Sequence, residues 1–435
     1  MMTFTVLTFC NAHSQNVITV LDEDGESEDI EMPEGMTVEA DSALMEFDNR
    51  TRLAEGNNIV VTDLPYDDDI LVDRLAHIPT TIEMPLNNIT RKFIDQYCNR
   101  MKRSVAVMLG SSNFYMPFFE EALEHYGLPL ELKYLPVIES ALRPTAQSPA
   151  GAVGLWQFML ATGKTYGLEI NTLVDERRDP VKSSYAAAHF LSDLYERFND
   201  WGLAIAAYNC GENAVSKAIL RAGGDEGADY WTVYNQLPRE TRGYVPAFIA
   251  ATYIMNYYCQ HGITPMEASL PNETDTVIVT KEVGFSQVAS VCGVTVEELR
   301  ALNPQYRRDI VPVDYSLRMP DHAIETFILN EDSIYSLSSV LRRRVIEDIN
   351  EAPAVATRTR TATKTTRYTP KRGNTKATSR KATASRKTTA RKTSSRKTTA
   401  KKAPARKSSA KKTTAKKTTA KKAPAKRTTS KKRRR

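Results

Sequence analysis

The sequence has few residues that could build a disulfide framework or a metal site. Among 435 residues there are five cysteines and six histidines, and no two cysteines form a CxxC pair. Cysteines spaced this widely are most often single buried thiols, and histidines this scattered give a metal ion no cluster of ligands. We therefore expect no disulfide framework, no metal and no cofactor.

Long apolar runs are also missing. A helix that crosses a bilayer needs about 20 apolar residues, and no stretch beyond the first fifteen residues reaches that length. Residues 4–10 form a short apolar run, and Ala12-His13-Ser14 after it resembles the small-x-small cleavage pattern of exported proteins. We interpret residues 1–14 as a signal segment; a buried N-terminal strand is the alternative. We expect an exported protein without a transmembrane span.

Acidic residues are absent from the last part of the chain. None follows Glu351, and 32 of the 59 Lys and Arg lie between Ala352 and Arg435, which leaves 27 basic against 52 acidic side chains before them. From Arg386 the chain repeats pentads such as RKTTA and KKAPA. Because such a segment cannot bury a core, we predict a disordered basic tail over 352–435. Its expected partners are polyanions, namely an anionic envelope surface, nucleic acid or the acidic body of the chain itself; a solvated tether is the alternative.

Between these two ends the composition and the apolar periodicity of the sequence change twice. Residues 15–88 are acidic with few periodic apolar positions, which predicts an extended leader that wraps around the next domain or links to it. Residues 89–262 contain amphipathic stretches typical of helices, two of which are predicted to end at Gly110 and Gly127. Asp179 and Pro180 are suited to begin a further helix, as its cap and its first residue. We therefore expect a compact, mainly α domain over 89–262.

A smaller unit follows over residues 271–324. TVIVT alternates as a strand does, FSQVASVCG and TVEELRALNP are typical of short helices, and YSLRMP is typical of a second strand. This β-α-α-β order gives an α+β character to the whole chain. Residues 325–351 are predicted to link this unit to the tail.

One acidic residue stands out within the helical domain. Glu139 is the single carboxylate of the stretch YLPVIESALRP. If the stretch is helical, Leu135, Glu139 and Leu142 share one apolar face, where desolvation would raise the pKa of the carboxyl group as a general acid requires. The alternative is a Glu at a helix end that pairs with Arg143.

Three other stretches carry polar residues at expected junctions between loops and helices. SPAGAVG is a flexible turn that runs into Gln157, AAYNCGEN contains Tyr208, and TRGYVP contains Tyr244. Each of these tyrosines could be a core aromatic with a bonded hydroxyl. Together with Glu139 they supply an acid, hydroxyls and amides, which is typical of a carbohydrate-binding cleft.

Four ordered motifs in this domain resemble a known family. IES, SPAGAVGLWQFM, AYNCGEN and TRGYVPAFIAA, spread over about residues 90–262, resemble the motifs of the family 1 lytic transglycosylases, and among them the membrane-bound lytic murein transglycosylase D group. The resemblance implies a goose-type lysozyme-like fold and cleavage of the MurNAc–GlcNAc β-1,4 bond of peptidoglycan. It also implies a place in the periplasm or cell envelope of a bacterium, with membrane association left open.

The resemblance assigns roles residue by residue. Glu139 matches the single catalytic acid/base of the family, and the substrate-binding positions match Ser148, Gln157, Met159, Tyr208, Asn209 and Tyr244. In the AYN motif Cys210 stands where Ala is commoner. The family needs one carboxylate because the C6 hydroxyl of muramic acid is the nucleophile and closes a 1,6-anhydro ring.

Two alternatives remain for the activity. A second carboxylate from Asp175, Glu176, Asp179 or Glu212 would make the enzyme a hydrolase of the lysozyme type. In the other alternative the chain is a polyanion- or glycan-binding envelope protein whose lysozyme-like domain is inactive.

The small unit resembles one LysM repeat, a glycan-binding module. VTVEELRALNP and YSLRMP carry the resemblance, whereas the usual Gly-Asp-Thr-Leu start and Pro-Gly turn are absent. Binding of GlcNAc is therefore left open. If glycan binds, the resemblance implies contacts near Phe285 and at the Asn303-Pro304 turn, with Val294 and Leu299 in the core.

Overall fold

The computed structural model describes residues 16–21, 26–37, 66–224, 227–268, 270–271 and 273–337. The chain divides into two units, Met1–Val355 and Ala356–Arg435, and all described residues belong to the first. The predicted signal segment, residues 338–351 of the predicted linker and the basic tail lie outside the described residues.

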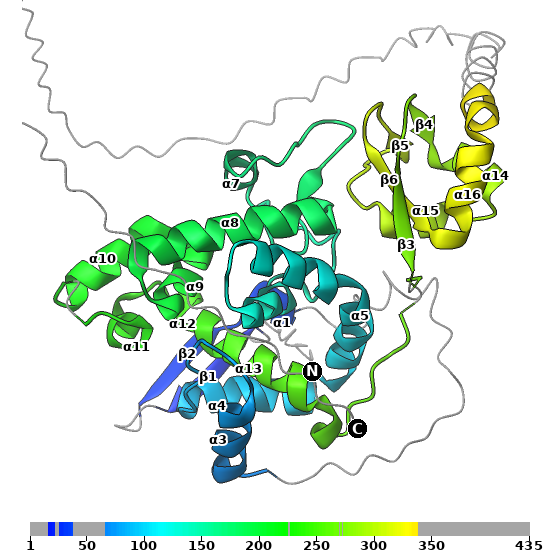
Figure 1. Ribbon diagram of the computed structural model, residues 1–435. Helices are drawn as coiled ribbons and strands as arrows, with labels where there is room; N and C mark the ends of the chain where they lie inside the picture. The colour runs from blue at the N-terminus through cyan, green and yellow to red at the C-terminus, as the bar shows by residue number, and fades with distance from the viewer. Residues whose placement is uncertain are drawn as a thin grey trace, which may run out of the picture. The chain divides into compact units, whose positions relative to one another are not determined.

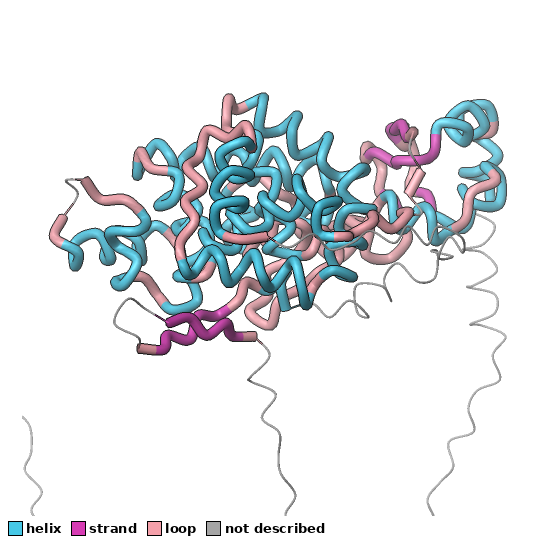
Figure 2. The backbone as a smooth tube through the Cα atoms, turned by 90° about the horizontal axis from the view of Figure 1, so that it is seen from below, coloured by secondary structure: helices cyan, strands magenta, loops and turns pink. Residues whose placement is uncertain are grey.

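Helices make up most of the first part of this unit (Figures 1 and 2). The longer ones are α3 (Asp68–His77), α4 (Asn88–Asp95), α5 (Lys102–His125), α8 (Pro180–Phe198), α9 (Trp201–Cys210), α10 (Glu212–Ala222) and α13 (Tyr244–Tyr257). The short ones are α1 (Glu34–Thr37), α6 (Leu135–Ser140), α7 (Leu160–Thr165), α11 (Tyr230–Val233) and α12 (Arg239–Arg242). No helix formed by the described residues combines the length and the apolar character needed to span a membrane. The predicted mainly α fold is confirmed.

The core of this part lies around α13. Twelve consecutive residues of this helix, 244–255, are buried, so it has no solvent-facing side over most of its length. A helix that is apolar all round belongs in the centre of a helical domain. Around it pack α4, α6 and α9, while α5 and α8 pack against each other.

The helix boundaries test the predicted start and stop signals. Asp179 caps α8 as predicted, since its Oδ1 accepts from the backbone N–H groups of Val181 (2.9 Å) and Lys182 (3.0 Å), and Pro180 is the first helical residue. The predicted helix end at Gly110 is wrong, because α5 runs through it to His125. A Cβ atom at position 110 would lie 2.0 Å from the carbonyl oxygen of Met266. Glycine is needed there for close packing and not for a cap.

The predicted leader over 15–88 wraps onto the helical domain and is not extended throughout where the structure describes it. Strands β1 (Val17–Leu21) and β2 (Ser27–Glu31) form an antiparallel hairpin, and α3 begins at a cap formed by Asp67. Ile18, Val20 and Ile30 of the hairpin are buried in the same core as the helices. This segment is therefore part of the helical domain.

The second part, residues 273–337, is called the LysM-like module below. Its strands are β3 (Thr274–Ile278), β4 (Val283–Gly284), β5 (Ile310–Val311) and β6 (Ser316–Pro320), and its helices are α14 (Phe285–Cys292), α15 (Val296–Leu302) and α16 (Asp321–Leu329). β3 pairs with β6 and β4 with β5, both antiparallel. The predicted elements are present as β3, α14, α15 and β6, and Val294 and Leu299 are buried as predicted; β4, β5 and α16 were not predicted. The predicted linker is wrong at its start, where α16 extends the module.

A loop of the helical part contributes to the core of the module. Val174 is fully buried among module residues. Backbone hydrogen bonds join the residues on either side of Val174 to the module. The Asp175 amide donates to the Gln305 carbonyl and the Arg307 amide donates to the Leu173 carbonyl, each at 2.9 Å. The module core is therefore completed by a residue outside its own sequence range.

Candidate active site

Glu139 lies in the last turn of α6, which ends one residue later. Ala141 and Leu142 have φ values of 52° and 59°, the left-handed region in which an L-residue cannot continue a helix. The predicted helical face is therefore wrong for Leu142, which lies beyond the helix end. Leu135 and Leu142 are nevertheless both fully buried. The helix end leaves the Glu139 side chain half-buried beside this core.

Tyr244 is the hydrogen-bond partner of this carboxyl group. It is the first residue of α13, its side chain is buried, and its hydroxyl donates to Glu139 Oε1 across 105 residues of sequence. Burial raises the pKa of Glu139 to about 8; the hydrogen bond from Tyr244 acts in the opposite direction, and the charge of Glu34 adds to the increase. A carboxyl group with this pKa carries its proton at neutral pH.

Tyr208 is the third member of this group. It lies near the end of α9, and its hydroxyl donates to the backbone carbonyl of Trp156 at 2.8 Å. Burial first, and then the nearby charge of Glu139, raises the pKa of both Tyr208 and Tyr244 well above the ordinary value. Three helices, α6, α9 and α13, thus bring one carboxyl group and two neutral phenols together.

The loop 144–159 is folded tightly beside this group. Gly154 has φ of 93°, and a Cβ atom there would lie 1.8 Å from the Arg177 carbonyl oxygen, so only glycine fits. Trp156, fully buried, donates from its indole N–H to Ser184 Oγ at 3.0 Å. These two contacts fix the loop on α8 and on the turn before it, and so fix the carbonyl that Tyr208 uses.

The loop holds two predicted site residues with different polar environments. Ser148 is buried, and its Oγ accepts from the Ala152 amide at 3.1 Å, which stabilises the loop itself. Gln157 has φ of 47°, and its Nε2 donates to the Gly154 carbonyl at 2.7 Å. Its Oε1 is buried and has no hydrogen-bond partner among the described residues. An unpaired buried acceptor is costly, so this oxygen is suited to receive a donor from a ligand.

Met159 and Asn209 are the remaining predicted site residues. Met159 is 46% exposed just before α7. Asn209 is exposed, and its Oδ1 accepts from Thr241 Oγ1 at 2.9 Å. Next to it, Cys210 is half-buried, and burial raises the pKa of its thiol. No described hydrogen bond joins Ser148, Met159 or Asn209 to Glu139.

The four carboxylates considered as a second catalytic group are engaged elsewhere. Asp175 accepts two hydrogen bonds from the Arg177 guanidinium, at 2.9 and 2.8 Å. Glu176 pairs with Lys182, Asp179 caps α8, and Glu212 lies 3.1 Å from Arg197.

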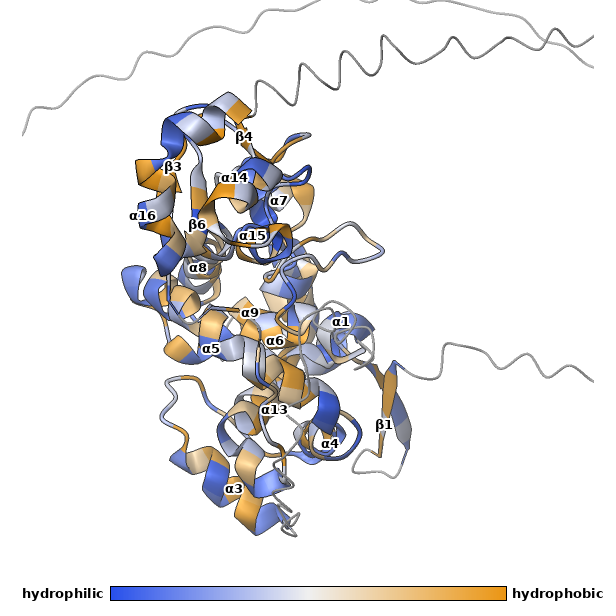
Figure 3. Cartoon of the chain, turned by 90° about the vertical axis from the view of Figure 1, so that its right-hand side faces the viewer, coloured by the Kyte–Doolittle hydropathy of each residue, from blue (hydrophilic) through white to orange (hydrophobic). Residues whose placement is uncertain are grey.

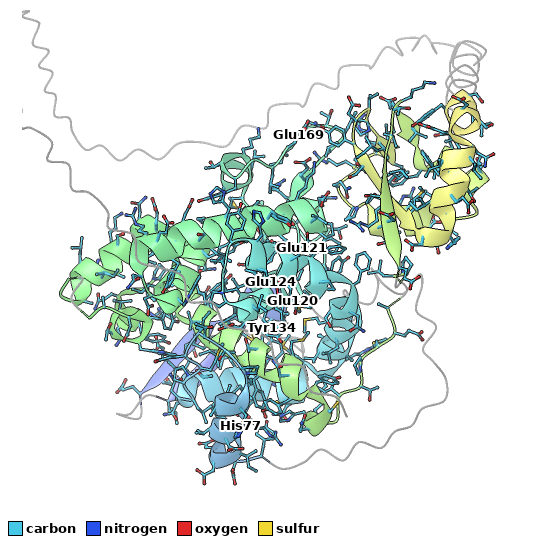
Figure 4. All side chains as sticks on the ribbon, in the orientation of Figure 1. His77, Glu120, Glu121, Glu124, Tyr134 and Glu169 are labelled. Carbon is cyan, nitrogen blue, oxygen red and sulfur yellow. The ribbon has the colours of Figure 1, made fainter. Side chains whose placement is uncertain are left out.

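Two acidic side chains of α5 are also paired. Figure 4 shows Glu120, Glu121 and Glu124 along α5. Glu120 lies 2.5 Å from Lys133 Nζ, and Glu121 accepts from the Tyr185 hydroxyl at 2.9 Å. Among the described residues, no group of three or more His, Cys, Asp and Glu side chains could hold a metal ion.

Two residues near Glu139 were missed by the sequence analysis. Ser140 is buried, and its hydroxyl lies 3.0 Å from the Pro136 carbonyl and 2.9 Å from the Leu155 carbonyl, which ties α6 to the loop 144–159. The IES motif pointed to this serine without indicating its contact. Glu34 of α1 was missed because it belongs to the predicted leader, where no motif marks it.

In the LysM-like module the fold itself uses the side chains of Phe285 and Asn303, while glycan contacts by the loop near Phe285 and by the Asn303-Pro304 turn stay a prediction. Phe285 is fully buried, and Asn303 is 1% exposed. The Asn303 side-chain amide donates to the carbonyls of Leu299 and Arg318 and accepts from the Arg318 amide, each at 2.8 Å. Both side chains therefore belong to the fold of the module.

Comparisons with known proteins agree with this division of the chain. Residues 116–230 match the family model of the transglycosylase SLT domain, and residues 273–336 match that of the "Lytic transglycosylase MltD, LysM-like domain". The chain therefore contains an SLT domain and an MltD-type LysM-like domain, as the resemblance predicted.

Curated relatives match part of the chain. It is 35% identical over 192 residues to membrane-bound lytic murein transglycosylase D of Escherichia coli, covering 43% of this chain and 42% of that protein. It is 33% identical to membrane-bound lytic murein transglycosylase F 1 of Alkalilimnicola ehrlichii, covering 28% and 26%. The chain thus spans less than half the length of these relatives. The crystal structure of the 70 kDa soluble lytic transglycosylase of Escherichia coli aligns at 26% identity and a TM-score of 0.28, covering 35% of this chain and 25% of that chain.

Proposed function

We propose that this chain is a peptidoglycan lytic transglycosylase that cleaves the MurNAc–GlcNAc β-1,4 bond without water. The observation that carries the proposal is Glu139, a half-buried carboxyl group with a pKa raised to about 8 and bonded by the Tyr244 hydroxyl. The SLT domain and the named relatives support the same substrate class.

In the proposed reaction Glu139 acts first as an acid and then as a base. Its proton passes to the glycosidic oxygen while the bond from that oxygen to C1 of muramic acid breaks. The C6 hydroxyl of the same sugar then attacks C1 and gives its proton to Glu139, which restores the starting state. One C–O bond breaks and one forms, so a 1,6-anhydro end results and no water is consumed. The nucleophile already belongs to the bound substrate, so no second carboxylate is required.

The other residues would hold the sugar and the acid in place. Tyr244 orients the carboxyl group through its hydroxyl, and Tyr208 fixes the loop 144–159 against α9. The unpaired Oε1 of Gln157 offers an acceptor for a sugar hydroxyl or acetamido N–H. Ser148, Met159 and Asn209 are proposed to line the substrate path, as the resemblance implies.

The test is a digest of purified peptidoglycan by the full chain, with Glu139→Gln beside it. The expected products are lighter by one water and end in 1,6-anhydro-muramic acid, and they fall by about 1,000-fold or more in the variant. Glu131→Gln is a poor control, because Glu131 is buried and accepts from two backbone amides. Glu121→Gln, at an exposed hydrogen bond, is a better one and should retain activity. Reducing muramic acid ends in place of anhydro ends would show a hydrolase.

We further propose that the protein works in the cell envelope, with the basic tail as a localising segment. The support is the uniform positive charge of residues 352–435 beside an acidic body. The same digest with a chain that ends at Glu351 separates the two roles. The expected result is unchanged product identity, with weaker sedimentation on anionic vesicles at low salt. Unchanged, salt-insensitive sedimentation of both chains would contradict the role of the tail, and products lost with the tail rather than with Glu139 would favour the binding alternative.

A further inference from the structure

The segment before the predicted catalytic domain packs on the helix that carries Glu139 and on the residues just before Tyr244. We call residues 16–37 the N-terminal strap; the structure describes 16–21 and 26–37 of it. It consists of the β1–β2 hairpin followed by α1. β1 lies against α4, β2 against α12, and α1 against α6.

The hairpin contacts the chain immediately before Tyr244. Glu28 forms an ion pair with Arg242, with 2.6 Å between Oε1 and Nη1. The backbone of Glu31 lies so close to Gly243 that a Cβ atom there would be 2.4 Å from the Glu31 carbonyl oxygen. The start of α13, from which the Tyr244 hydroxyl reaches Glu139, is therefore packed against the strap.

The helix of the strap contacts the helix of Glu139. A Cβ atom at Gly35 would lie 2.5 Å from the Val137 carbonyl oxygen and 2.6 Å from that of Ile138. Met36 beside it is buried in the same core as Ile138. Figure 3 shows α1 next to α6. The strap thus contacts the chain beside both partners of the Glu139–Tyr244 hydrogen bond: α1 packs on the helix of Glu139, and β2 packs on the residues before Tyr244.

This arrangement places a second acidic residue near Glu139. Glu34 is the first residue of α1, its residue surface is largely exposed, and its charge acts on Glu139. Partial burial also raises the pKa of Glu34 itself. The Tyr244 hydroxyl, which bonds Glu139, and the nearby Tyr208 hydroxyl both have a pKa raised well above the ordinary value, so both are neutral at physiological pH. Among these groups, Glu34 is the one that carries a charge.

We propose that the N-terminal strap completes the active site by packing against α6 and against the start of α13, and that Glu34, next to the contact of Gly35 with α6, is a positioning residue for the Glu139 proton. The proposal rests on the function proposed above for Glu139. It assigns Glu34 no contact with the reacting atoms and no role as a nucleophile. In this arrangement an exposed carboxylate tunes the acid, while the acid alone transfers the proton.

The test compares Glu34→Gln with Glu31→Gln, two substitutions that remove one negative charge from the same strap. Glu31 is exposed, so its side chain serves as the matched control. The rate of anhydro-product formation is measured against pH. Without the charge of Glu34, Glu139 should lose its proton at lower pH, so the alkaline limb of the profile should move down by about 0.5–1 pH unit. The Glu31→Gln profile should match that of the unaltered chain.

A second measurement does not depend on activity. Titration of the Glu139 carboxyl carbon by NMR should show the same downward shift in Glu34→Gln and none in Glu31→Gln. Equal Glu139 titrations in all three chains would overturn the proposal, even if activity falls in Glu34→Gln. If the unaltered chain makes no anhydro product, the function proposed above fails, and the carboxyl titration still decides whether Glu34 acts on Glu139.

Discussion

The Glu139 site and the LysM-like module both contain residues to which a family motif assigns glycan contacts, and the two regions treat those residues differently. At the Glu139 site, the carboxyl group is half-buried with a raised pKa, and Gln157 has an unpaired acceptor. In the module, every polar atom of the Asn303 side chain is bonded to backbone, and Phe285 is fully buried.

The difference separates two reasons why a residue belongs to a motif. A polar group whose bonds are all satisfied inside the protein stabilises the fold and has nothing left for a ligand. A polar group held at a cost, with a shifted pKa or a missing partner, is a candidate for function. By this criterion the IES and GLWQF motifs contain the candidates for function, and the Asn303 side chain of the module belongs to its fold.

The largest effect should come from Asn303→Ala. The change removes the side-chain partner of the Arg318 carbonyl and amide, and buried groups left unpaired cost about 1–3 kcal/mol each, whereas the Leu299 carbonyl keeps the backbone amide of residue 303 as its donor. We expect the module to lose about 3 kcal/mol of stability, measured in the full chain by hydrogen exchange of the module amides.

The control for this change is Glu297→Ala on the exposed surface of α15. Glu297 lies 3.4 Å from Arg300 in a pair that is more than half exposed, and such pairs contribute about 0–1 kcal/mol. Loss of glycan binding in Asn303→Ala without any loss of exchange protection would contradict the structural role.

A smaller effect, on the reaction rate and not on stability, should come from Tyr244→Phe. Removal of this hydroxyl leaves Glu139 without the donor that orients it, so the rate of product formation should fall by about 10- to 100-fold. The lost hydrogen bond also lowered the pKa of Glu139, so the alkaline limb of the pH profile should move up, in the direction opposite to that of Glu34→Gln.

The matched control is Tyr234→Phe. The Tyr234 hydroxyl is buried and has no hydrogen-bond partner among the described residues, so its removal should leave both the rate and the pH profile unchanged. Equal losses in the two variants would show that Tyr244 acts through packing and not through its hydroxyl.

Features fixed by neighbouring residues could be predicted from the sequence. The start of α8 depends on Asp179 and Pro180, both at the helix end itself, and the β-α-α-β order of the module follows from local patterns. The break expected at Gly110 failed because the reason for this glycine is the Met266 carbonyl, which only the fold brings near.

The site was predictable in part for the same reason. The motifs identified Glu139, Tyr208 and Tyr244, but their mutual contacts depend on three helices that meet across the domain. Glu34 carried no signal, since a short acidic segment without periodic apolar positions is typical of a linker. The fold brings Glu34 near Glu139 because its neighbour Gly35 packs on the backbone of α6.

The smallest effect concerns the free energy of unfolding, which burial of the Glu139 carboxyl group lowers. Its pKa is raised from 4.5 in the unfolded chain to about 8 in the folded chain, so the folded state holds more protons between these values. The free energy of unfolding must therefore fall as pH rises from about 4.5 to 8. Glu139→Gln has no such proton, so it should equal the unaltered chain in stability near pH 5 and exceed it at pH 8.

Because water screens part of the charge of this half-buried group, we expect a gain of about 1–3 kcal/mol at pH 8. Urea unfolding of the helical domain at pH 5, 6.5 and 8 measures it, with Glu31→Gln as the control whose difference should not vary with pH. A gap between Glu139→Gln and the unaltered chain that stays constant with pH would mean that Glu139 ionises as an ordinary carboxyl group. Glu139 would then lower the free energy of unfolding no more than the fully bonded Asn303 of the module does. The distinction between the two regions would fail.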